Sequence, residues 1–424
     1  MTSAGEEHIL VVGGGRELPG LLRRHRPGVR TSVLCQLSLL PRLREVSGHE
    51  RVLSLRPDSE DAEWIAAAEQ VHAERPITRI ATFGERDQLR AAVIGAALGI
   101  ATHSVDTVTA VHQKHQMRRR LAEAGVEDVR WAQLDSAQAV RNWVARHPGR
   151  WVIKPVDGSG SAGVAIVEDE EAAAAAYLRC VQSAHTGNSG SPAVLVEQFL
   201  AGMQISVESF SEDGEHCPVA ITGKYSDPAS LVELGHVVPA VLPVDAPAVI
   251  AAHVAQVLDA LGVRDGVCHT ELVLTEDGPR VIETHLRLAG DEIPYLVRDA
   301  TGVDLVAALV RQTLGEPVLA GIRDTLAGHP LRPQAIWFGV APCAGRLVRV
   351  EGLPEAPAAG LEIEQEVPDG GEVSPLQDSD SRPLWARADG ATSEAAIARA
   401  RAAVSACRLV LSVPAATEDD EEYL

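Results

Sequence analysis

A single lysine precedes a glycine-rich segment in the second quarter of the chain. Residues 151–167 read WVIKPVDGSGSAGVAIV, so Lys154 and Pro155 separate an apolar run from three glycines and two serines. This order predicts a strand, a glycine-rich loop and a second strand. The backbone N–H groups of such a loop can surround an anion because few side chains intervene, and a lysine ammonium is a common partner for phosphate. We therefore predict an anion site formed by Lys154 and this loop.

Lysine is rare in this sequence. Of the 38 basic residues only three are lysines, namely Lys114, Lys154 and Lys224. Because arginine occupies nearly every other basic position, a retained lysine indicates a place that needs a compact, mobile ammonium. The alternative is that the three survive by chance, and this alternative is stronger for Lys224 than for Lys154.

Two glutamates flank the turn of a predicted β-hairpin at residues 267–285. The turn contains Asp277 and Gly278. Glu271 and Glu283 are each six residues from Asp277, so an in-register hairpin places them opposite each other with Cβ atoms roughly 5 Å apart. Two such carboxylates repel each other unless a cation lies between them, and a hard divalent cation with oxygen ligands meets this need.

The second strand of this hairpin carries further polar residues. Glu283, His285 and Arg287 share one face, because side chains alternate along a strand. The alternative interpretation of the hairpin is a pair of exposed glutamates on a solvent-facing sheet.

The first hundred residues alternate between strand and helix patterns, which predicts a parallel, doubly wound sheet. The expected strands are residues 8–12, 31–35, 51–55 and 78–83, and the expected helices are residues 17–26, 60–73 and 87–98. Residues 13–15 are all glycine, but Leu18 stands where a dinucleotide-binding motif needs glycine, so we expect a tight turn. We expect Glu85 to cap the next helix rather than to face a ligand.

The remaining chain mixes helices and strands. We expect one helix over residues 106–124, and the bland interpretation of its basic residues, Lys114 among them, is a solvated face. Further helices are expected at residues 137–146, 168–184, 247–261, 294–300, 304–314 and 393–406, and strands at residues 129–132, 150–154, 193–199, 204–210, 219–224, 334–341, 346–350 and 408–413. The acidic tail TEDDEEYL is predicted to be disordered.

Composition narrows the class of protein. A chain of 424 residues predicts several domains. A net charge of −21 argues against binding nucleic acid through a broad basic surface. The six scattered cysteines favour free thiols in a reducing compartment. With no signal-peptide pattern and no long apolar stretch, we expect a soluble, cytoplasmic protein that binds neither nucleic acid nor membranes.

Four stretches occur in an order that resembles the ATP-grasp superfamily across nearly the whole chain. They are IKPVDGSGSAGV, VEQFLAGMQISVE, LVELGHVVPA and ETHLRLAGDEIP. Within the superfamily the sequence is most similar to the L-amino acid ligases that make dipeptides, and LVELGHVVPA is the stretch that indicates this branch. The resemblance implies an α/β ATP-grasp fold with a Rossmann-like parallel sheet at the N-terminus, a two-part ATP-binding domain with a mobile lid, and a C-terminal α+β domain.

The resemblance also implies boundaries for these parts. The N-terminal domain spans residues 1–105, the lid subdomain 106–200, the central subdomain with the metal site 201–330, the C-terminal domain 331–413 and the acidic tail 414–424.

Roles for single residues follow from the resemblance. The residues expected to bind ATP are Lys114, Lys154, Gly158, Ser159, Gly160, Ser161, Gly163, Glu197, Phe199, Leu200, Gln204 and Lys224, with Glu197, Phe199 and Leu200 as the adenine hinge. Those expected to bind Mg²⁺ are Glu271, Glu283 and His285. Arg287 and Gly290 are expected to hold the substrate carboxylate and, with Lys154, to act in catalysis, while Glu233 and His236 face the amino acid.

Two positions depart from the family pattern. Gln204 stands where relatives usually have a glutamate near the ribose, and His285 stands where an asparagine is usual. Imidazole suits Mg²⁺ less well than an amide oxygen, so we expect slightly altered metal geometry.

The resemblance implies an ADP-forming ligase that joins an amino acid carboxylate to an amine through an acyl phosphate, with ATP and two Mg²⁺ ions as cofactors and Mn²⁺ as an alternative metal. The expected partners are small molecules, with a homodimer left open. One alternative is a related enzyme that uses formate or bicarbonate in nucleotide-type metabolism. Another is a nucleotide-binding protein without catalysis.

Overall fold

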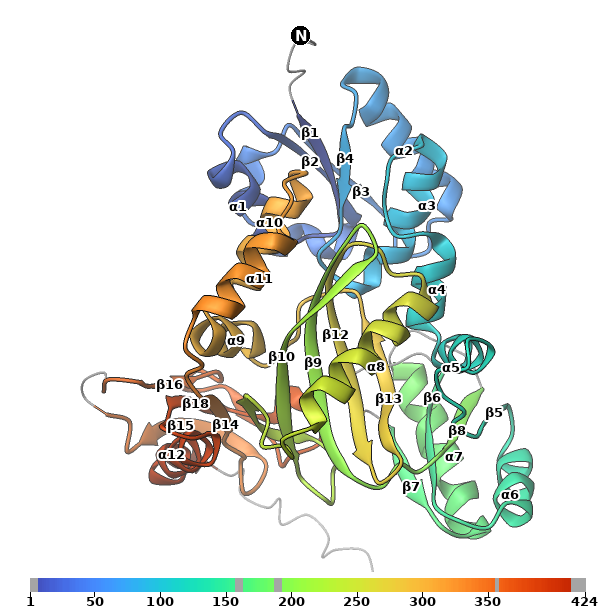
Figure 1. Ribbon diagram of the computed structural model, residues 1–424, viewed down its shortest axis with the longest axis vertical. Helices are drawn as coiled ribbons and strands as arrows, with labels where there is room; N and C mark the ends of the chain where they lie inside the picture. Colours follow the sequence, from blue (N-terminus) through green and yellow to red (C-terminus); the bar gives the residue numbers. More distant parts are fainter. Residues whose placement is uncertain (1–6, 157–162, 187–192, 355–357, 413–424) are drawn as a thin grey trace, which may run out of the picture.

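The N-terminal part of the protein is a parallel sheet with helices on both faces. The computed structural model describes residues 7–156, 163–186, 193–354 and 358–412 (Figure 1). The sheet has the order β3-β2-β1-β4, which confirms the predicted parallel sheet. Its elements are β1 (His8–Val12), α1 (Leu18–His25), β2 (Arg30–Gln36), two 3₁₀ helices (Leu37–Arg42 and Val46–Gly48), β3 (Arg51–Leu55), α2 (Asp61–Glu74), β4 (Arg79–Ala81), a third 3₁₀ helix (Glu85–Asp87) and α3 (Gln88–Leu98). Every residue of β1 is buried, because α1 covers one face and α2 and α3 cover the other.

The second part is an antiparallel sheet of order β5-β8-β6-β7, backed by two helices that bury their apolar faces against it. Its elements are α4 (Val105–His112), α5 (Lys114–Glu123), β5 (Trp131–Leu134), α6 (Ala137–Arg146), β6 (Trp151–Pro155), β7 (Ala165–Val167), α7 (Glu170–Thr186) and β8 (Val194–Gln198). The pairing of β6 with β7 confirms the two strands predicted on either side of the glycine-rich loop.

The single helix predicted over residues 106–124 is wrong. Two helices, α4 and α5, meet at Gln113, whose backbone is extended with φ −98° and ψ 100°. No glycine or proline marks this break, so the sequence pattern reads as continuous. Lys114 therefore begins α5. Its side chain is only 10 % exposed and its ammonium lies 2.8 Å from Glu283, which argues against the bland interpretation of a solvated face at this residue.

A long, largely antiparallel sheet forms the centre of the molecule, with the order β13-β12-β9-β10-β11-β14-β18-β16. Its first part consists of β9 (Met203–Glu212), β10 (Glu215–Ser226), β11 (Glu233–Val238), α8 (Ala246–Leu261), β12 (Gly266–Thr275), β13 (Gly278–His285), α9 (Ile293–Thr301), α10 (Leu305–Thr313) and α11 (Leu319–Gly328). The apolar stripe of α8 packs on one face of the sheet, and α9, α10 and α11 pack on the other. None of the helices in the described ranges combines the length and apolar character that crossing a membrane requires.

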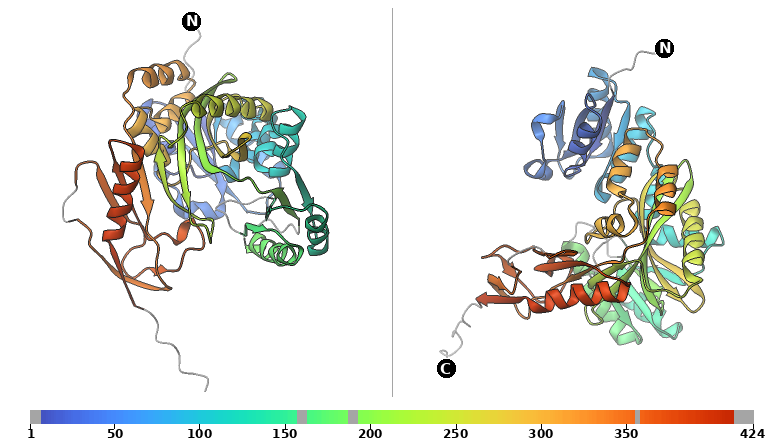
Figure 2. Two further views of the ribbon diagram at one scale, coloured as in Figure 1. Left: turned by 60° about the horizontal axis from the view of Figure 1, so that its bottom comes forward. Right: turned by 60° about the vertical axis from the view of Figure 1, so that its left-hand side comes forward.

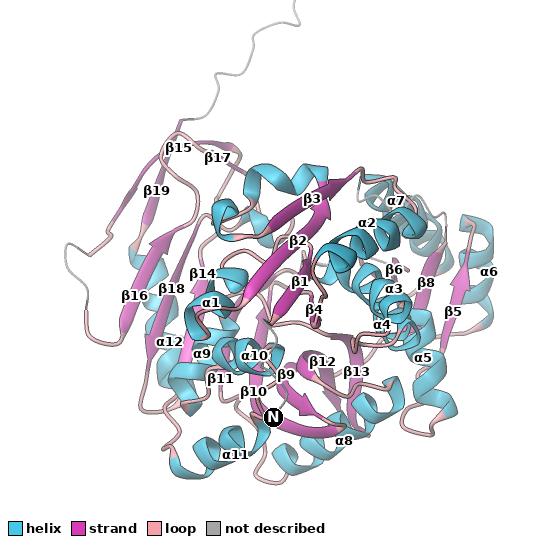
Figure 3. Ribbon diagram, turned by 90° about the horizontal axis from the view of Figure 1, so that it is seen from above, coloured by secondary structure: helices cyan, strands magenta, loops and turns pink. Residues whose placement is uncertain are grey.

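The C-terminal region, residues 331–412, continues this central sheet. It consists of β14 (Gln334–Phe338), β15 (Gly345–Glu351), β16 (Leu361–Gln365), β17 (Glu372–Val373), a 3₁₀ helix (Ser379–Ser381), β18 (Leu384–Asp389), α12 (Ser393–Ala406) and β19 (Arg408–Ser412). Here β14, β18 and β16 extend the long sheet, while β17, β15 and β19 form a small one. The region projects from one side of the molecule (Figure 2). Seen from above, it lies on the opposite side of the molecule from β5, β8 and β6 (Figure 3). The elements β11, α11, β16, β17 and β18 were not predicted.

Candidate active site

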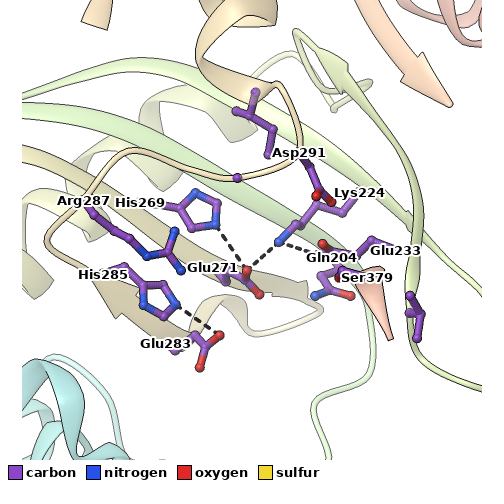
Figure 4. A pocket seen from close by; sticks show the side chains of 13 residues that line it. Gln204, Lys224, Glu233, His269, Glu271, Glu283, His285, Arg287, Asp291 and Ser379 are labelled. Atoms are coloured by element: carbon purple, nitrogen blue, oxygen red, sulfur yellow. Dashed lines mark hydrogen bonds and ion pairs between the residues drawn. The ribbon is translucent and has the colours of Figure 1, made fainter. Parts of the chain in front are cut away.

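A polar pocket of about 160 Å³ lies where the central sheet, the loop after β13 and the C-terminal region meet (Figure 4). Its predicted lining residues are Gln204, Lys224, Glu233, Glu271, Glu283, His285, Arg287 and Gly290. Its other lining residues, which the sequence did not indicate, are Val232, His269, Asp291, Ile293 and Ser379. A Cβ atom added to Gly290 would meet nothing within 4 Å, so this glycine faces open space.

Glu271 and Glu283 are direct cross-strand partners, as predicted. The turn itself pairs Thr275 with Gly278, a register that would carry Glu271 to Ile282 instead. A β-bulge at Ile282 adds one residue to β13 and restores the pairing of the two glutamates. Without it, the Glu283 side chain would point to the other face of the sheet. The bulge therefore brings the two carboxylates together.

A buried carboxylate holds the backbone at this bulge. The Val281 N–H group donates a hydrogen bond of 2.7 Å to Oε1 of Glu127, and Nε2 of His253 on α8 lies 2.6 Å from the same oxygen. Arg118 of α5 approaches the other oxygen of Glu127 at 3.3 Å. The side chain of Glu127 is 1 % exposed. Its contacts fix the segment after α5 against the hairpin of β12 and β13.

Each of the three lysines is paired with a glutamate predicted to belong to the site. All three are buried residues. The pairs are Lys114 with Glu283 at 2.8 Å, Lys154 with Glu197 at 2.6 Å, and Lys224 with both Glu271 at 2.6 Å and Glu233 at 2.5 Å. The rare lysines thus lie in the surroundings of one site rather than scattered over the surface.

The lysines decide the charge state of the facing glutamates. Burial by itself raises the pKa of Glu271, but the charge of Lys224 outweighs it and holds this pKa below the usual range. Lys114 has the same effect on the pKa of Glu283. Both carboxylates are therefore ionised although they face each other across the hairpin.

Two histidines accompany these carboxylates. His269 lies between Glu208, 2.9 Å from Nδ1, and Glu271, 3.2 Å from Nε2. Burial lowers the pKa of His269, but the charge of Glu208 outweighs it and raises the pKa to about 9. The ring stacks on that of His285 with centroids 5.9 Å apart, and Nε2 of His285 lies 3.2 Å from Glu283. The sequence held a signal for His269, since it shares a strand face with Glu271.

Glu197 is buried between α5 and the lid sheet. It accepts a hydrogen bond of 2.9 Å from Nε of Arg118 and one of 2.6 Å from Lys154. Burial raises its pKa, but the charges of Arg118 and Lys154 outweigh this effect and lower the pKa to about 2. Conversely, burial lowers the pKa of Lys154. Arg118 also contacts Glu127, which holds the bulge of the β12–β13 hairpin. One buried ionic network therefore runs from Lys154 through Glu197 and Arg118 to this bulge.

Other predicted nucleotide-binding residues lie apart from the described pocket lining. Phe199 stacks against Arg150, whose guanidinium carbon is 3.9 Å from the ring centroid, and Leu200 follows it. Gly163 begins the approach to β7 with φ +74°. The predicted loop residues Gly158, Ser159, Gly160 and Ser161 lie outside the described residues.

The prediction that Glu85 caps a helix is wrong. Its carboxylate accepts a hydrogen bond of 2.9 Å from Nε of Arg287 and lies 3.1 Å from Nδ1 of His285. The short helix that begins at Glu85 has no side-chain cap. Burial raises the pKa of Glu85, but His285 and Arg287 hold it well below its usual range. The N-terminal domain therefore contributes an ionised carboxylate to the wall behind Arg287.

Glu233 and His236 lie on β11 at the opposite end of the pocket. His236 is fully buried, with Nε2 3.0 Å from Asp291 and 3.8 Å from Glu233. Among the described residues, these three are the set whose potential metal-binding atoms lie within 4.8 Å of one another. Lys224 contacts Glu233 and Arg382 contacts Asp291, so these carboxylates already belong to an ionic network with protein cations.

The facing glutamates fit a hard divalent cation. Carboxylate oxygens are the donors that Mg²⁺ prefers. In the part of the chain that the structure describes, Lys224 and His269 both contact Oε1 of Glu271, which leaves Oε2 of this residue for a ligand. His285 fits less well, because Nδ1 lies 3.1 Å from Glu85 and Nε2 lies 3.2 Å from Glu283, so both ring nitrogens already face carboxylates.

Comparison with known proteins gives two family matches. Residues 148–294 match the ATP-grasp domain, and residues 337–412 match L-amino acid ligase C-terminal domain 2. Dapdiamide A synthase of Enterobacter agglomerans is 26% identical over 240 residues, which cover 55% of this chain and 56% of that protein. Alanine–anticapsin ligase of Bacillus subtilis is 25% identical over 232 residues, 50% of this chain and 49% of that protein. The chain thus spans about half the length of the curated relatives it matches.

Solved structures show the same fold over nearly the whole chain. An L-amino acid ligase from Bacillus licheniformis superimposes with a TM-score of 0.77 at 20% identity, covering 97% of this chain and 100% of that one. A phosphoribosylglycinamide synthetase from Anaerococcus prevotii gives a TM-score of 0.68 at 14% identity, covering 96% and 100%. The chain therefore contains a region that matches the ATP-grasp domain, followed by a region that matches L-amino acid ligase C-terminal domain 2, within a fold that a solved L-amino acid ligase shares.

Proposed function

We propose that this protein is an ATP-dependent ligase that joins the carboxylate of one amino acid to the amine of another and releases ADP and phosphate. The observation that carries this proposal is the facing pair Glu271 and Glu283, beside Lys224 and Arg287 in one polar pocket. Phosphoryl transfer depends mostly on positioning and charge neutralisation, and this set of residues supplies both.

At the phosphate end, Lys114, Lys154 and Lys224 would contact the phosphates of ATP. The loop residues Gly158, Ser159, Gly160, Ser161 and Gly163 would close over them, and Glu197, Phe199, Leu200 and Gln204 would lie along the nucleoside. Glu271 and Glu283 would hold Mg²⁺, which supplies charge neutralisation at the phosphate oxygens. Two ions, and Mn²⁺ as a substitute, stay predictions from the sequence.

At the amino acid end, Arg287 and Gly290 would hold the reacting carboxylate. A carboxylate oxygen attacks the γ-phosphorus of ATP, the bond from that phosphorus to ADP breaks, and an acyl phosphate forms. The amine of the second substrate then attacks the acyl carbon, loses a proton and displaces phosphate. Arg287 would stabilise the oxyanion in this step, because its guanidinium already lies at the pocket wall, held by Glu85. Glu233 is suited to an α-ammonium group.

The C-terminal region favours an amino acid over formate or bicarbonate as the substrate. Residues 337–412 match a domain named for L-amino acid ligases, and two similar proteins are named as a ligase of alanine and a dapdiamide synthase. A phosphoribosylamine–glycine ligase is also similar, at 26% identity over 264 residues, so the alternative remains testable. The test is a screen of amino acid pairs with Mg·ATP for ADP, phosphate and an amide product. Phosphate release with formate or bicarbonate, and with no amino acid, would contradict the proposal.

Glu283→Gln tests catalysis at the metal hairpin. The variant removes the charge that pairs with Lys114, so we expect Mg²⁺-dependent ADP release to fall by about 100-fold. Calorimetry should show weaker binding of Mg·ADP. Glu276→Gln is the matched control because Glu276 is exposed at the turn of the same hairpin, and it should keep full activity. If Glu283→Gln binds Mg·ADP as the wild type does, the metal assignment is refuted. If the wild type shows no turnover with any amino acid pair, the non-catalytic alternative is favoured.

A cytoplasmic location and a homodimer stay predictions from the sequence. The described cysteines are all free, which supports a reducing compartment.

A further inference from the structure

One arginine of the C-terminal region reaches the amino acid end of the pocket. Arg382 lies just before β18, and its side chain is 6 % exposed. It donates two hydrogen bonds to the carboxylate of Asp291, 2.8 Å from Nη1 and 2.6 Å from Nη2. Nη1 also donates to the backbone carbonyl of Glu233 at 3.1 Å, and Nε donates to that of Ser379 at 2.7 Å. Asp291, Glu233 and Ser379 all line the pocket.

The residue that Arg382 holds has an unusual backbone. Asp291 and Glu292 both adopt positive φ angles, 54° and 60°, although neither is glycine. Residues other than glycine rarely adopt a positive φ, and such a backbone conformation persists only where the surroundings impose it. This turn directly follows Gly290 and lies four residues after Arg287, the two residues assigned to the reacting carboxylate. The conformation of the turn therefore sets where Gly290 lies.

The surroundings of Arg382 leave it little freedom. Its guanidinium carbon lies 3.8 Å from the ring centroid of Phe338 on β14, and Phe338 in turn packs against His236. Nε2 of His236 lies 3.0 Å from Oδ2 of Asp291, the oxygen that also accepts the hydrogen bond from Nη1 of Arg382. His236 on β11 and Arg382 in the C-terminal region thus converge on the carboxylate of Asp291, and Phe338 packs against both of them.

We propose that Arg382 is a positioning residue of the ligase, because it fixes the turn at residues 290–292 and the start of β11. It thereby sets where the backbone of Gly290 and the side chain of Glu233 lie in the pocket. This inference rests on the proposed function of the pocket. It also gives the C-terminal region a task in substrate binding, because that region reaches the pocket through Ser379 and Arg382. A lysine cannot replace this arginine, since a single ammonium cannot make the fork-shaped contact with Asp291 while stacking on Phe338.

The first test does not depend on turnover. Hydrogen–deuterium exchange is measured on wild type, Arg382→Lys, Arg382→Gln and the control Arg408→Lys, whose arginine pairs with Glu351 on the surface. We expect faster exchange in peptides that cover residues 286–296 in both Arg382 variants, with β1 peptides unchanged as a measure of intact folding. Arg408→Lys should match the wild type. Unchanged exchange at residues 286–296 in folded Arg382→Lys would overturn the proposal.

The second test separates positioning from general destabilisation. With the amino acid pair that gives the largest ADP release, the KM for at least one amino acid should rise about 10- to 100-fold in Arg382→Lys, because charge-assisted hydrogen bonds are lost. Mg·ADP binding should stay within about twofold. Asp291→Asn should reproduce the change in KM, and its combination with Arg382→Gln should be no worse than the more severe single variant. Additive effects, or equal losses in Mg·ADP binding, would overturn the proposal. Absence of turnover in the wild type would instead refute the proposed function, with the exchange experiment still deciding the role of Arg382.

Discussion

At the scale of single residues, the rarity of lysine carried more information than any one motif. Lys114, Lys154 and Lys224 are each buried against a glutamate that was predicted to belong to the site. Residue type could indicate this much because most other basic positions had become arginine. It could not indicate which glutamate each lysine meets, since these partners come from other strands.

Glu85 shows the limit of this kind of prediction. Its position before a helix suggested a cap, yet its carboxylate lies against Arg287 and His285, which are about 200 residues away in the sequence. A local pattern always offers a local partner, and a distant one becomes visible only when the domains are packed together. The N-terminal domain therefore contributes to the site through Glu85, for which the local pattern favoured a helix cap over a ligand contact.

We expect Glu85→Gln to lower kcat/KM for ADP release by about 10- to 100-fold, because Arg287 and His285 lose their charged acceptor. Steady-state kinetics with the amino acid pair from the screen measure this change. Glu45→Gln is the matched control: Glu45 belongs to the same domain and pairs only with the surface-facing Arg23 and Arg24 among its described contacts. Equal values of kcat/KM in wild type and Glu85→Gln would show that Arg287 does not need this partner.

At the scale of elements, the hairpin was predicted with the right partners but by a simpler route. Counting from Asp277 placed Glu271 opposite Glu283, and the structure confirms the pair. The actual turn is shifted, and the bulge at Ile282 compensates for the shift. A bulge is a choice between registers that differ by one residue, and it is settled by contacts outside the hairpin. Here the contact is the hydrogen bond from Val281 to Glu127, which no hairpin pattern contains.

Glu127→Gln tests this explanation of the bulge. The new amide group would face the guanidinium of Arg118 with one donor against another, so we expect a loss of about 3–5 kcal/mol in the free energy of unfolding. Urea unfolding measures this loss. Mg·ADP binding, followed by calorimetry, should weaken as well because Glu283 is two residues from Val281.

The control for this experiment is Glu123→Gln. Glu123 ends α5 a few residues earlier, is 69 % exposed and forms a long surface contact with Arg119, so its substitution should change stability by less than about 0.5 kcal/mol. If Glu127→Gln loses stability but binds Mg·ADP like the wild type, the carboxylate supports the fold without positioning the hairpin.

At the scale of the whole molecule, the sequence predicted the N-terminal sheet and most of the central part well and the C-terminal region poorly. Strands such as β1 are uniformly apolar because both faces are covered, and α8 has a clear apolar stripe. By contrast, β16 and β17 are short, and exposed glutamates occupy every second position of β16 and the first position of β17. The loop before β18 is rich in Ser and Asp. In the folded molecule β18 and β16 extend the end of the long sheet and β17 pairs with β15, so these strands depend on partners that a local sequence pattern does not contain.

The same long sheet explains why the boundary expected at residue 331 stays a prediction. Strand β11 of the central part pairs directly with β14 of the C-terminal region, so backbone hydrogen bonds cross the boundary without interruption. A separate C-terminal domain would leave the edge of β11 open, whereas here the C-terminal region completes both the sheet and the pocket wall.

The buried network of Lys154, Glu197, Arg118 and Glu127 joins the lid sheet to the rest of the molecule, and its stability should depend on pH. The pKa of Glu197 is lowered from 4.5 to about 2 in the folded protein. A depressed pKa of this kind contributes stability that is fully present above about pH 4.5 and is lost as the pH falls toward 2. The contribution is lost on acidification because the unfolded chain takes up a proton at Glu197 below about pH 4.5, whereas the folded protein, with two buried cations beside this carboxylate, keeps it ionised.

Glu197→Gln should therefore be less stable than the wild type by about 3–5 kcal/mol at neutral pH, since Arg118 and Lys154 lose their common counter-charge. The difference between the two proteins should shrink as the pH falls below about 4.5, because protonation of Glu197 then stabilises the unfolded wild type but not the unfolded variant. Urea unfolding at a series of pH values measures both curves. Glu168→Gln, which removes the partner of Arg150 at the surface, should follow the wild type at every pH. A difference between wild type and Glu197→Gln that stays constant down to about pH 3 would mean that the charge of Glu197 is not what holds the lid sheet against α5.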